Sequence, residues 1–322
     1  MQKKTLIFNI GYHAGFYSEY LGMLFAIAYC RMNGIGFKLF SKDANFKIKN
    51  GWTDYFLPFC EEVTDDFHST FNSRFPFPSV KQYAKFIYKK LRYGTKTPKW
   101  IWLKFTFSFL KQSFQKNFYK KKYNFTYYTF ELWNKFYYQL NPCYNYSVLD
   151  KKVEKQTLRD LYKHIICETY KFNEYTENQI DNIIKNLNLP EKFVGIHIRQ
   201  GDKITEDEVY DWQKYFTFLY KNVKYCKNVF IFTDDYQVIE NIKAELPDYQ
   251  IYTLCKKEDR GYDNNAFQNR GLEYKTQKLL EMFASVEILC KSALFIGAYN
   301  SSPDMFIDFV RENNSFFIDK NN

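Results

Sequence analysis

The sequence predicts an α/β protein built from two domains, each with a doubly wound parallel sheet. Its 322 residues exceed the length of one typical domain. Apolar runs of strand length alternate with helical periodicity in two blocks of the chain, which is typical of parallel sheets with crossover helices. Polar side chains follow several predicted strands directly, as they do at ligand sites of open α/β sheets.

The first block opens with a βαβ unit. Residues 5–10 are predicted as a strand, residues 17–32 as a helix and residues 37–40 as the next strand, with Gly34 and Gly36 ending the helix. The apolar run at 5–10 is too short for the core of a signal peptide. No run of 18 apolar residues occurs, so we expect no helix that spans a membrane.

The second block begins near residue 176 and repeats the alternation. Strands are expected at 193–198, 228–232, 250–254 and 293–296, and helices at 176–187, 211–222, 238–244, 276–290 and 301–312. Thr176 is expected to cap the first of these helices. We place the domain boundary near 165–180, so that the domains are residues 1–170 and 171–322.

The seven cysteines are scattered and form no C-x-x-C pair. Neither a disulfide framework nor a zinc site is therefore expected, and a reducing cytoplasm is the predicted compartment. Cys30, Cys167 and Cys290 lie within apolar helical patterns and are expected in the core.

The sharpest motif is FVGIHIRQGDKITE, residues 193–206. His197 and Arg199 are two apart at the end of a predicted strand, so they point the same way. A guanidinium there suits a diphosphate. Asp202, Lys203 and Glu206 follow, and a carboxylate among them could act as a general base. Alternatively, His197 is a core histidine and Arg199 pairs structurally with Asp202.

A second motif, VFIFTDD, places Thr233, Asp234 and Asp235 at the same sheet edge. Carboxylates there can accept hydrogen bonds from a base or a ribose, or hold a metal. The alternative is that an aspartate caps the following helix.

A third motif, ALFIGAYNSSPDMF, has Asn300, Ser301 and Ser302 between a strand and a helix. Free backbone N–H groups and the two hydroxyls there can face a phosphate. The alternative is simple capping, with Pro303 in the first turn.

Together, H-x-R-x-x-D-K, T-D-D and the strand followed by N-S-S resemble the GDP-fucose-dependent fucosyltransferases, in particular the alpha-1,6 enzymes and their rhizobial chitooligosaccharide relatives. The likeness covers roughly residues 170–315. The spacing to Glu206 is one residue shorter than in that family, and the Gly201-Asp202 pair is similar to the alpha-1,2 branch. The loop and helix at 11–29 are similar in placement.

The resemblance implies a GT-B fold, with two Rossmann-like domains facing a cleft, and an inverting reaction without metal or other cofactor. The donor, a nucleotide sugar, would bind the second domain and the glycan acceptor the first, where His13, Gly15 and Tyr17 would face the cleft.

In the donor site, the resemblance implies that Arg199 clamps the diphosphate with His197 beside it. Asp234 or Asp235 would contact the nucleoside, and Ser301 and Ser302 the phosphate. Glu206 is the expected base, with Lys203 close by and Asp202 and Asp207 as rivals.

Two features depart from the family pattern. Gln200 stands where the family often has a second arginine. The acidic residue that helps to recognise guanine is either Glu281 or Glu287. Another nucleotide sugar is therefore an alternative donor, and a non-catalytic glycan- or nucleic-acid-binding protein is a further alternative.

The charge is concentrated in one segment. The net charge is +10, yet residues 74–122 carry fourteen Lys and Arg and no acid, and the remaining chain is at −4. This segment, within a basic aromatic helical insertion at about 74–128, has three possible explanations: a solvated helical face, an anionic membrane surface, or single-stranded nucleic acid, which is the least favoured. The membrane alternative predicts a peripheral enzyme on the inner face of the membrane.

Overall fold

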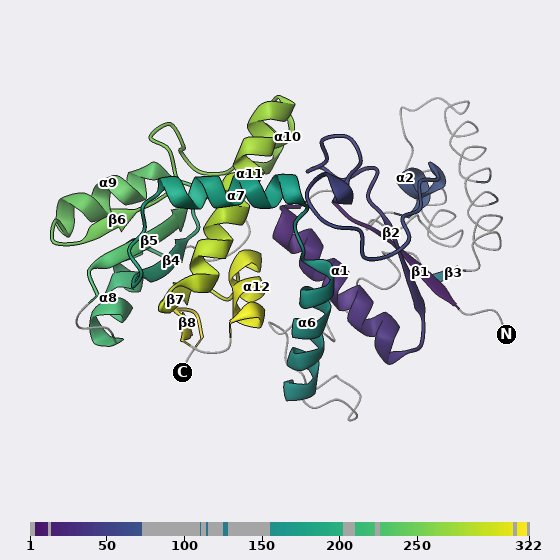
Figure 1. Cartoon of the computed structure of the whole chain (residues 1–322), viewed down its shortest axis with the longest axis horizontal. Coiled ribbons are helices and arrows are strands. Elements are labelled where there is room, and N and C mark those ends of the chain that lie inside the picture. Colours follow the sequence, from purple (N-terminus) through teal and green to yellow (C-terminus); the bar gives the residue numbers. More distant parts are fainter. Residues whose placement is uncertain are drawn as a thin grey trace, which may run out of the picture.

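The computed structural model describes residues 4–11, 14–72, 110, 114, 125–127, 155–201, 210–222, 226–311 and 314–320. Several predictions concern positions outside these ranges: those for His13, for Asp202, Lys203, Glu206 and Asp207, and for nearly all of the insertion at 74–128. The described residues form two α/β halves with helices packed between them (Figure 1).

The N-terminal half contains a three-stranded parallel sheet in the order β2-β1-β3. Its strands are β1 (Thr5–Asn9), β2 (Gly36–Phe40) and β3 (Phe125–Tyr127). Helix α1 (Phe16–Met32) connects β1 to β2, which confirms the predicted βαβ unit. Two short helices follow, η1 (Trp52–Asp54) and α2 (Phe67–Phe71).

The C-terminal half contains a five-stranded parallel sheet in the order β6-β5-β4-β7-β8. Its strands are β4 (Val194–Ile198), β5 (Asn228–Thr233), β6 (Gln250–Tyr252), β7 (Leu294–Gly297) and β8 (Ser315–Phe317). The chain moves outward from β4 to β6 and then returns to place β7 on the other side of β4. This reversal opens a crevice at the carboxyl ends of β4 and β7, where doubly wound sheets bind ligands.

The helices of this half are α8 (Trp212–Asn222), α9 (Tyr236–Glu245), α10 (Asn264–Gln268), α11 (Leu272–Lys291) and α12 (Ser302–Val310). A separate hydrophobic cluster packs α8 and α9 against one face of the sheet. Two further helices, α6 (Lys155–Thr169) and α7 (Glu174–Asn186), pack against α1 and α11, respectively.

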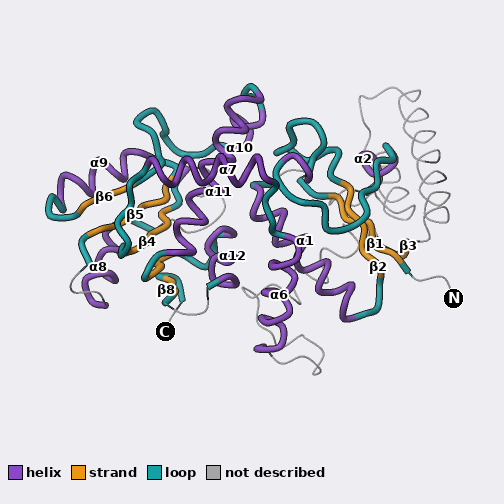
Figure 2. The backbone as a smooth tube through the Cα atoms, viewed as in Figure 1, coloured by secondary structure: helices purple, strands orange, loops and turns teal. Residues whose placement is uncertain are grey.

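One continuous hydrophobic core joins the two halves. Figure 2 shows the helices that lie between the two groups of strands, among them α1 and α12. Helix α1 is buried on nearly all sides because it lies against its own sheet and also against α6 and α12. The ring centroid of Phe16 lies 4.9 Å from that of Phe283 in α11, and the ring centroid of Tyr20 lies 5.6 Å from that of Phe306 in α12. This aromatic contact sets how the halves face each other.

Two local predictions are wrong, and one strand was not predicted. Asn173 rather than Thr176 caps α7: the Asn173 side chain accepts from the Thr176 N–H at 2.9 Å, so the helix begins earlier. Cys167 is exposed, because its side of α6 faces solvent rather than the core. Strand β8 was not predicted, because its three residues are too few to show a period. No helix in the part of the chain that the structure describes is long and apolar enough to cross a membrane.

Candidate functional site

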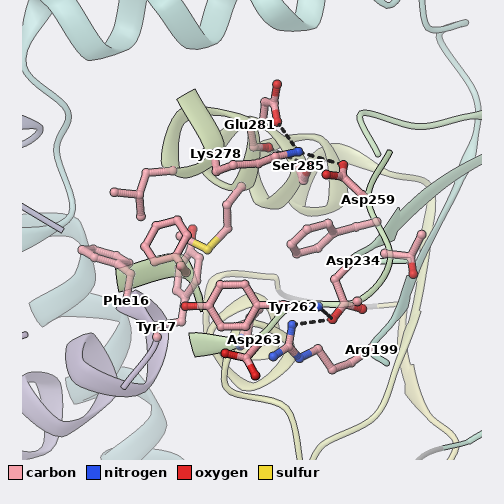
Figure 3. A pocket seen from close by; sticks show the side chains of 18 of the residues that line it. Phe16, Tyr17, Arg199, Asp234, Asp259, Tyr262, Asp263, Lys278, Glu281 and Ser285 are labelled. Carbon is pink, nitrogen blue, oxygen red and sulfur yellow. Dashed lines mark hydrogen bonds and ion pairs between the residues drawn. The ribbon is translucent and has the colours of Figure 1, made fainter. Parts of the chain in front are cut away.

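A cavity of 570 Å³ lies between the halves, at the carboxyl ends of β4, β5 and β7 (Figure 3). This volume is typical of sites for small molecules and cofactors. Its walls come from the start of α1, the loop at 45–46, the strand ends, the long segment between β6 and α11, and the start of α12. The sequence-predicted residues Gly15, Tyr17, His197, Arg199, Thr233, Asp234, Asn300, Ser301 and Ser302 all line it.

Arg199 is held by Asp234. Its Nη1 donates to Asp234 Oδ2 at 2.8 Å, and its guanidinium carbon lies 4.9 Å from the ring centroid of Tyr262. The same carboxylate accepts from the backbone N–H groups of Gln200 at 2.8 Å and Tyr262 at 2.9 Å. Asp234 therefore connects three segments of the cavity wall, and both of its carboxylate oxygens accept hydrogen bonds from other groups of the protein.

Two glycines allow these segments to meet. Gly201 has φ +54°, and a Cβ built on it would lie 2.4 Å from the carbonyl oxygen of Tyr262. Gly261 has φ +83°, and its Cβ would lie 2.9 Å from the Cα of Gly201. Only glycine fits this backbone crossing. The sequence alone identifies Gly201 only as a residue of a turn.

Asp235 follows the capping alternative. Its side chain accepts from the Gln237 N–H at 2.9 Å and caps α9. Thr233 is buried, and its hydroxyl oxygen accepts from the Asp235 N–H at 3.3 Å. Of the two adjacent aspartates, Asp234 lines the cavity, and Asp235 is not among the residues that form its wall.

His197 is both a satisfied buried histidine and part of the cavity wall. Its Nδ1 is hydrogen-bonded to the carboxylate of Asp304, and its ring stacks on Phe232 with the centroids 4.5 Å apart. The residue is only 3% exposed. Burial raises the pKa of the Asp304 carboxyl, and the charge of His197 opposes that rise.

In the turn between β7 and α12, the backbone N–H groups of residues 298–301 donate within the protein, and an anion site at the start of α12 stays a prediction. The Ala298 N–H donates to Asp304 at 2.7 Å, and those of Tyr299 and Asn300 donate to Asp319 at 2.7 and 2.9 Å. The Ser301 N–H donates to the Ala298 carbonyl at 2.9 Å. Two carboxylates that the sequence analysis missed thus hold the turn.

A second polar cluster lies on the opposite wall. Lys278 Nζ lies 2.7 Å from Asp259 and 3.2 Å from Glu281, and Lys256 Nζ lies 2.7 Å from Glu281. Burial lowers the pKa of Lys278, but its carboxylate partners outweigh burial and raise the pKa overall. Of the two candidate acids, Glu281 lines the cavity, whereas Glu287 lies away from it with a pKa raised by burial.

On the N-terminal side, Gly15 is the N-cap residue of α1 and lines the cavity. Tyr17 is 1% exposed, and its hydroxyl lies 2.7 Å from that of Tyr170. Burial raises the pKa of Tyr17 well above its usual value. The hydroxyl of Tyr17 is therefore engaged in the core, and its ring forms part of the wall.

The family model for alpha-(1,6)-fucosyltransferase N- and catalytic domains matches residues 162–302. The resemblance to the fucosyltransferases is confirmed. The matched stretch includes His197, Arg199, Asp234 and Ser301, and it ends at Ser302, before Asp304 and Asp319. No curated protein sequence matches the chain.

Solved fucosyltransferase structures share the fold over nearly the whole chain. The NodZ fucosyltransferase from Bradyrhizobium is 14% identical with a TM-score of 0.52, over 97% of this chain and 93% of that one. NodZ alpha-1,6-fucosyltransferase soaked with GDP-fucose is 13% identical with a TM-score of 0.51, over 96% and 93%. The apo form of POFUT1 is 13% identical with a TM-score of 0.50, over 98% of both chains. The expected GT-B fold is therefore confirmed, and the chain is a glycosyltransferase.

Among the described residues, no group of three or more His, Cys, Asp or Glu side chains has the geometry of a metal site. The adjacent aspartates at 234 and 235 are used differently, one for Arg199 and one for the cap of α9. The geometry of Asp234 and Asp235 therefore gives no support to the metal-binding alternative considered for the T-D-D motif.

Proposed function

We propose that this enzyme transfers L-fucose from GDP-fucose to a hydroxyl of a glycan acceptor. The observation that carries the proposal is the cavity at the carboxyl ends of β4 and β7, where Arg199 and the start of α12 line one wall. A guanidinium and hydroxyls at this edge suit a diphosphate. A similar fold, that of NodZ, was solved after soaking with GDP-fucose, which supports this donor.

In the proposed reaction the acceptor oxygen attacks C1 of fucose from the face opposite the diphosphate. The C1–O bond breaks as the new glycosidic bond forms, so the configuration inverts and GDP leaves with the bonding electrons. Arg199 stabilises the departing charge, with the hydroxyls of Ser301 and Ser302 beside it. We expect no metal to be needed, so chelation with EDTA should leave transfer unchanged.

The acceptor proton goes to a carboxylate, for which Glu206 is the candidate, with Lys203 close by and Asp202 and Asp207 as rivals. Residues 171–322 would bind the donor and residues 1–170 the acceptor. Gly15, the ring of Tyr17 and His13 are the candidates for the acceptor side. Because Asp234 is engaged with Arg199, we assign to it the positioning of that guanidinium. Contact of Asp235 with the nucleoside stays a prediction.

Calorimetric titration with GDP, GDP-fucose and UDP tests the proposal. We expect binding of both guanosine nucleotides and much weaker binding of UDP. Absence of binding by any guanosine nucleotide would reject the donor assignment. Glu206→Gln should keep GDP affinity and abolish transfer, whereas Asp207→Asn should keep both. Retained transfer in Glu206→Gln would remove Glu206 as the base.

Another nucleotide sugar is the second candidate donor. Gln200 brings no charge to the presumed diphosphate site, and Glu281 is paired with Lys256 and Lys278 rather than presenting an unpaired carboxylate to a base. The same titration separates the candidates, because preferred binding of UDP would favour this one.

The basic segment at residues 74–122 suits a lipid-borne acceptor. We propose that it holds the enzyme at an anionic membrane on the cytoplasmic side, where surface polysaccharide or glycolipid is built. Sedimentation with vesicles containing anionic lipid should show binding that weakens as salt increases. Equal partition with neutral vesicles, or no binding at low salt, would contradict the membrane role.

A further inference from the structure

In the part of the chain that the structure describes, four cationic side chains line the cavity: Arg199, Arg260, Arg270 and Lys278. Three of them already have acceptors within the protein. Arg199 donates to the carboxylate of Asp234 at 2.8 Å, and Lys278 Nζ lies 2.7 Å from the carboxylate of Asp259. Arg260 Nη1 donates to the backbone carbonyl of Asp259 at 3.2 Å.

Arg270 differs from these three. Its side chain is exposed, and no carboxylate among the described residues lies at ion-pair distance from its guanidinium. The guanidinium carbon lies 5.5 Å from the ring centroid of Tyr274, which is 44% exposed and belongs to the same wall. A contact with the face of a ring orients a guanidinium without using its N–H groups. Those groups are therefore available to a ligand.

An aromatic surface connects Arg270 with the proposed diphosphate site. The guanidinium carbon of Arg199 lies 4.9 Å from the ring centroid of Tyr262, and that ring packs on Phe267 with the centroids 5.5 Å apart. The Arg270 N–H donates to the Phe267 carbonyl at 3.1 Å. Figure 3 shows Tyr262 next to Arg199 and across the cavity from Lys278. Both rings line the cavity, and rings of this kind stack on flat nucleobases.

The order of these groups matches the order of the parts of a nucleotide. A diphosphate at Arg199 leaves the rings of Tyr262 and Phe267 for the base, and Arg270 is the next cation along this wall. Guanine presents two neighbouring acceptors, O6 and N7, and a planar guanidinium can donate to both at once. Adenine has an amino donor beside N7, and uracil presents O4 without a neighbouring acceptor.

We propose that Arg270 determines the preference for guanine: its guanidinium donates two hydrogen bonds to O6 and N7 of the donor's base, which stacks on Tyr262 and Phe267. This inference rests on the proposed function and deepens it by assigning the contact that selects the base. Glu281 lies 2.7 Å from Lys256 and 3.2 Å from Lys278, so its carboxylate is already paired. Recognition through the acceptor edge of guanine needs no unpaired acid.

The first test pairs one atom of the ligand with one side chain. 7-Deaza-GDP has a carbon in place of N7, so in calorimetry it should bind the wild-type protein roughly tenfold more weakly than GDP does. Arg270→Met keeps much of the side-chain length but has no donor. It should bind GDP roughly tenfold less tightly than the wild type, and GDP and 7-deaza-GDP equally. A difference between the two ligands that persists in Arg270→Met would overturn the inference.

Arg260→Met is the matched control. It also removes a guanidinium from the cavity wall, but one that already donates to the Asp259 carbonyl. The ratio of the affinities for GDP and 7-deaza-GDP should stay at its wild-type value. Loss of that ratio in Arg260→Met as well would mean that no specific contact of Arg270 gives the preference, and it too would overturn the inference.

A gain of preference completes the test. The amide of glutamine offers one donor and one acceptor, which match N7 and the amino group of adenine. Arg270→Gln should therefore raise the affinity for ADP relative to GDP, roughly tenfold or more in the ratio, which loss of structure alone does not produce. An unchanged ratio would overturn the inference. If the wild-type protein binds no guanosine nucleotide, the proposed function fails; if it binds GDP and these ratios ignore Arg270, this inference alone fails.

Discussion

The guanidinium of Arg199 donates to the carboxylate of Asp234 across 2.8 Å, and this ion pair joins the ends of two adjacent strands. Asp234 also accepts the backbone N–H groups of Gln200 and Tyr262. One carboxylate therefore fixes the cation of the presumed diphosphate site and the loop that closes over it. Asp234 therefore contributes both to the geometry of the presumed diphosphate site and to the stability of the fold.

Replacing Asp234 by alanine should lower both stability and ligand affinity. The change leaves a half-buried guanidinium and two backbone donors without their acceptor, so we expect a loss of about 2–4 kcal/mol in the free energy of unfolding. GDP affinity should fall roughly tenfold or more, because Arg199 is no longer held. Urea denaturation and calorimetry measure the two effects.

Asp235→Ala is the control for this change. It removes the N-cap of α9, so stability should fall by about 1 kcal/mol while GDP affinity is nearly unchanged. Equal loss of GDP affinity in both variants would contradict the separate roles given to the two aspartates.

Gly201→Ala should disturb the cavity without changing any charge. The new methyl would lie within 2.5 Å of backbone atoms of Tyr262, at a residue with φ +54°. We expect a loss of about 2 kcal/mol or more in stability and weaker GDP binding, because the segment around Tyr262 must move away. Thermal unfolding with and without GDP checks this.

Gly271→Ala provides a matched comparison, since no atom lies within 4 Å of its added methyl and its φ is −62°. Its stability should stay within about 1 kcal/mol of the wild type. Equal stability of Gly201→Ala and Gly271→Ala would contradict the role given to the backbone crossing at Gly201.

Arg199→Lys should separate charge from geometry. Lysine keeps the positive charge but loses the planar fork that can bind two oxygens at once. We expect GDP affinity to fall roughly tenfold, with transfer falling further because the leaving diphosphate carries the developing charge. Arg31→Lys, on α1 in an exposed pair with Glu168 of α6, should leave both GDP affinity and transfer unchanged. Undiminished transfer by Arg199→Lys would exclude a bidentate role.

Asp54 gives a pH-dependent contribution to stability. Its carboxylate accepts the backbone N–H groups of residues 48–51, at 2.6–3.0 Å. Burial acts to raise its pKa, but these N–H groups outweigh burial and lower it. A lowered pKa means stability that is present above the unfolded value, near 3.9, and lost as the pH falls through the folded value.

Asp54→Asn should therefore cost about 1–3 kcal/mol at pH 7 and much less near pH 3. Urea denaturation of both proteins at the two pH values measures the difference. An equal loss of unfolding free energy at pH 7 and near pH 3 would show that the charge of Asp54 is not involved. The variant also loosens the loop that carries Asn45 and Phe46 to the cavity wall.

The elements of regular structure were largely predictable from the sequence. Strands β1, β4, β5 and β7 and helix α11 agree with their predictions to within a few residues, because buried strands and amphipathic helices leave a clear period. The polar residues that follow each predicted strand also indicated where the site lies, because the carboxyl ends of parallel strands meet at one edge of the sheet. His197, Arg199, Asp234 and Ser301 accordingly line one cavity.

The partners of those side chains were not predictable in the same way. Asp234 sits one residue from Asp235, yet one holds Arg199 and the other caps a helix, because it is the carboxylate of Asp234 that accepts from the Tyr262 N–H. Asp319 binds a turn about twenty residues earlier. Such contacts depend on which segments the sheet order brings together, and no local pattern records that.

The sequence by itself determined that the chain forms parallel sheets and that its chemistry lies at strand ends, because periodicity and strand polarity are local properties. Only the tertiary structure decided how each polar group is used. The backbone crossing at Gly201 and Gly261, the Asp304–His197 pair and the aromatic contact between Phe16 and Phe283 join residues far apart in the chain. Their hydrogen bonds and packing exist only after the halves have met, so the division of roles among the aspartates is a property of the assembled fold.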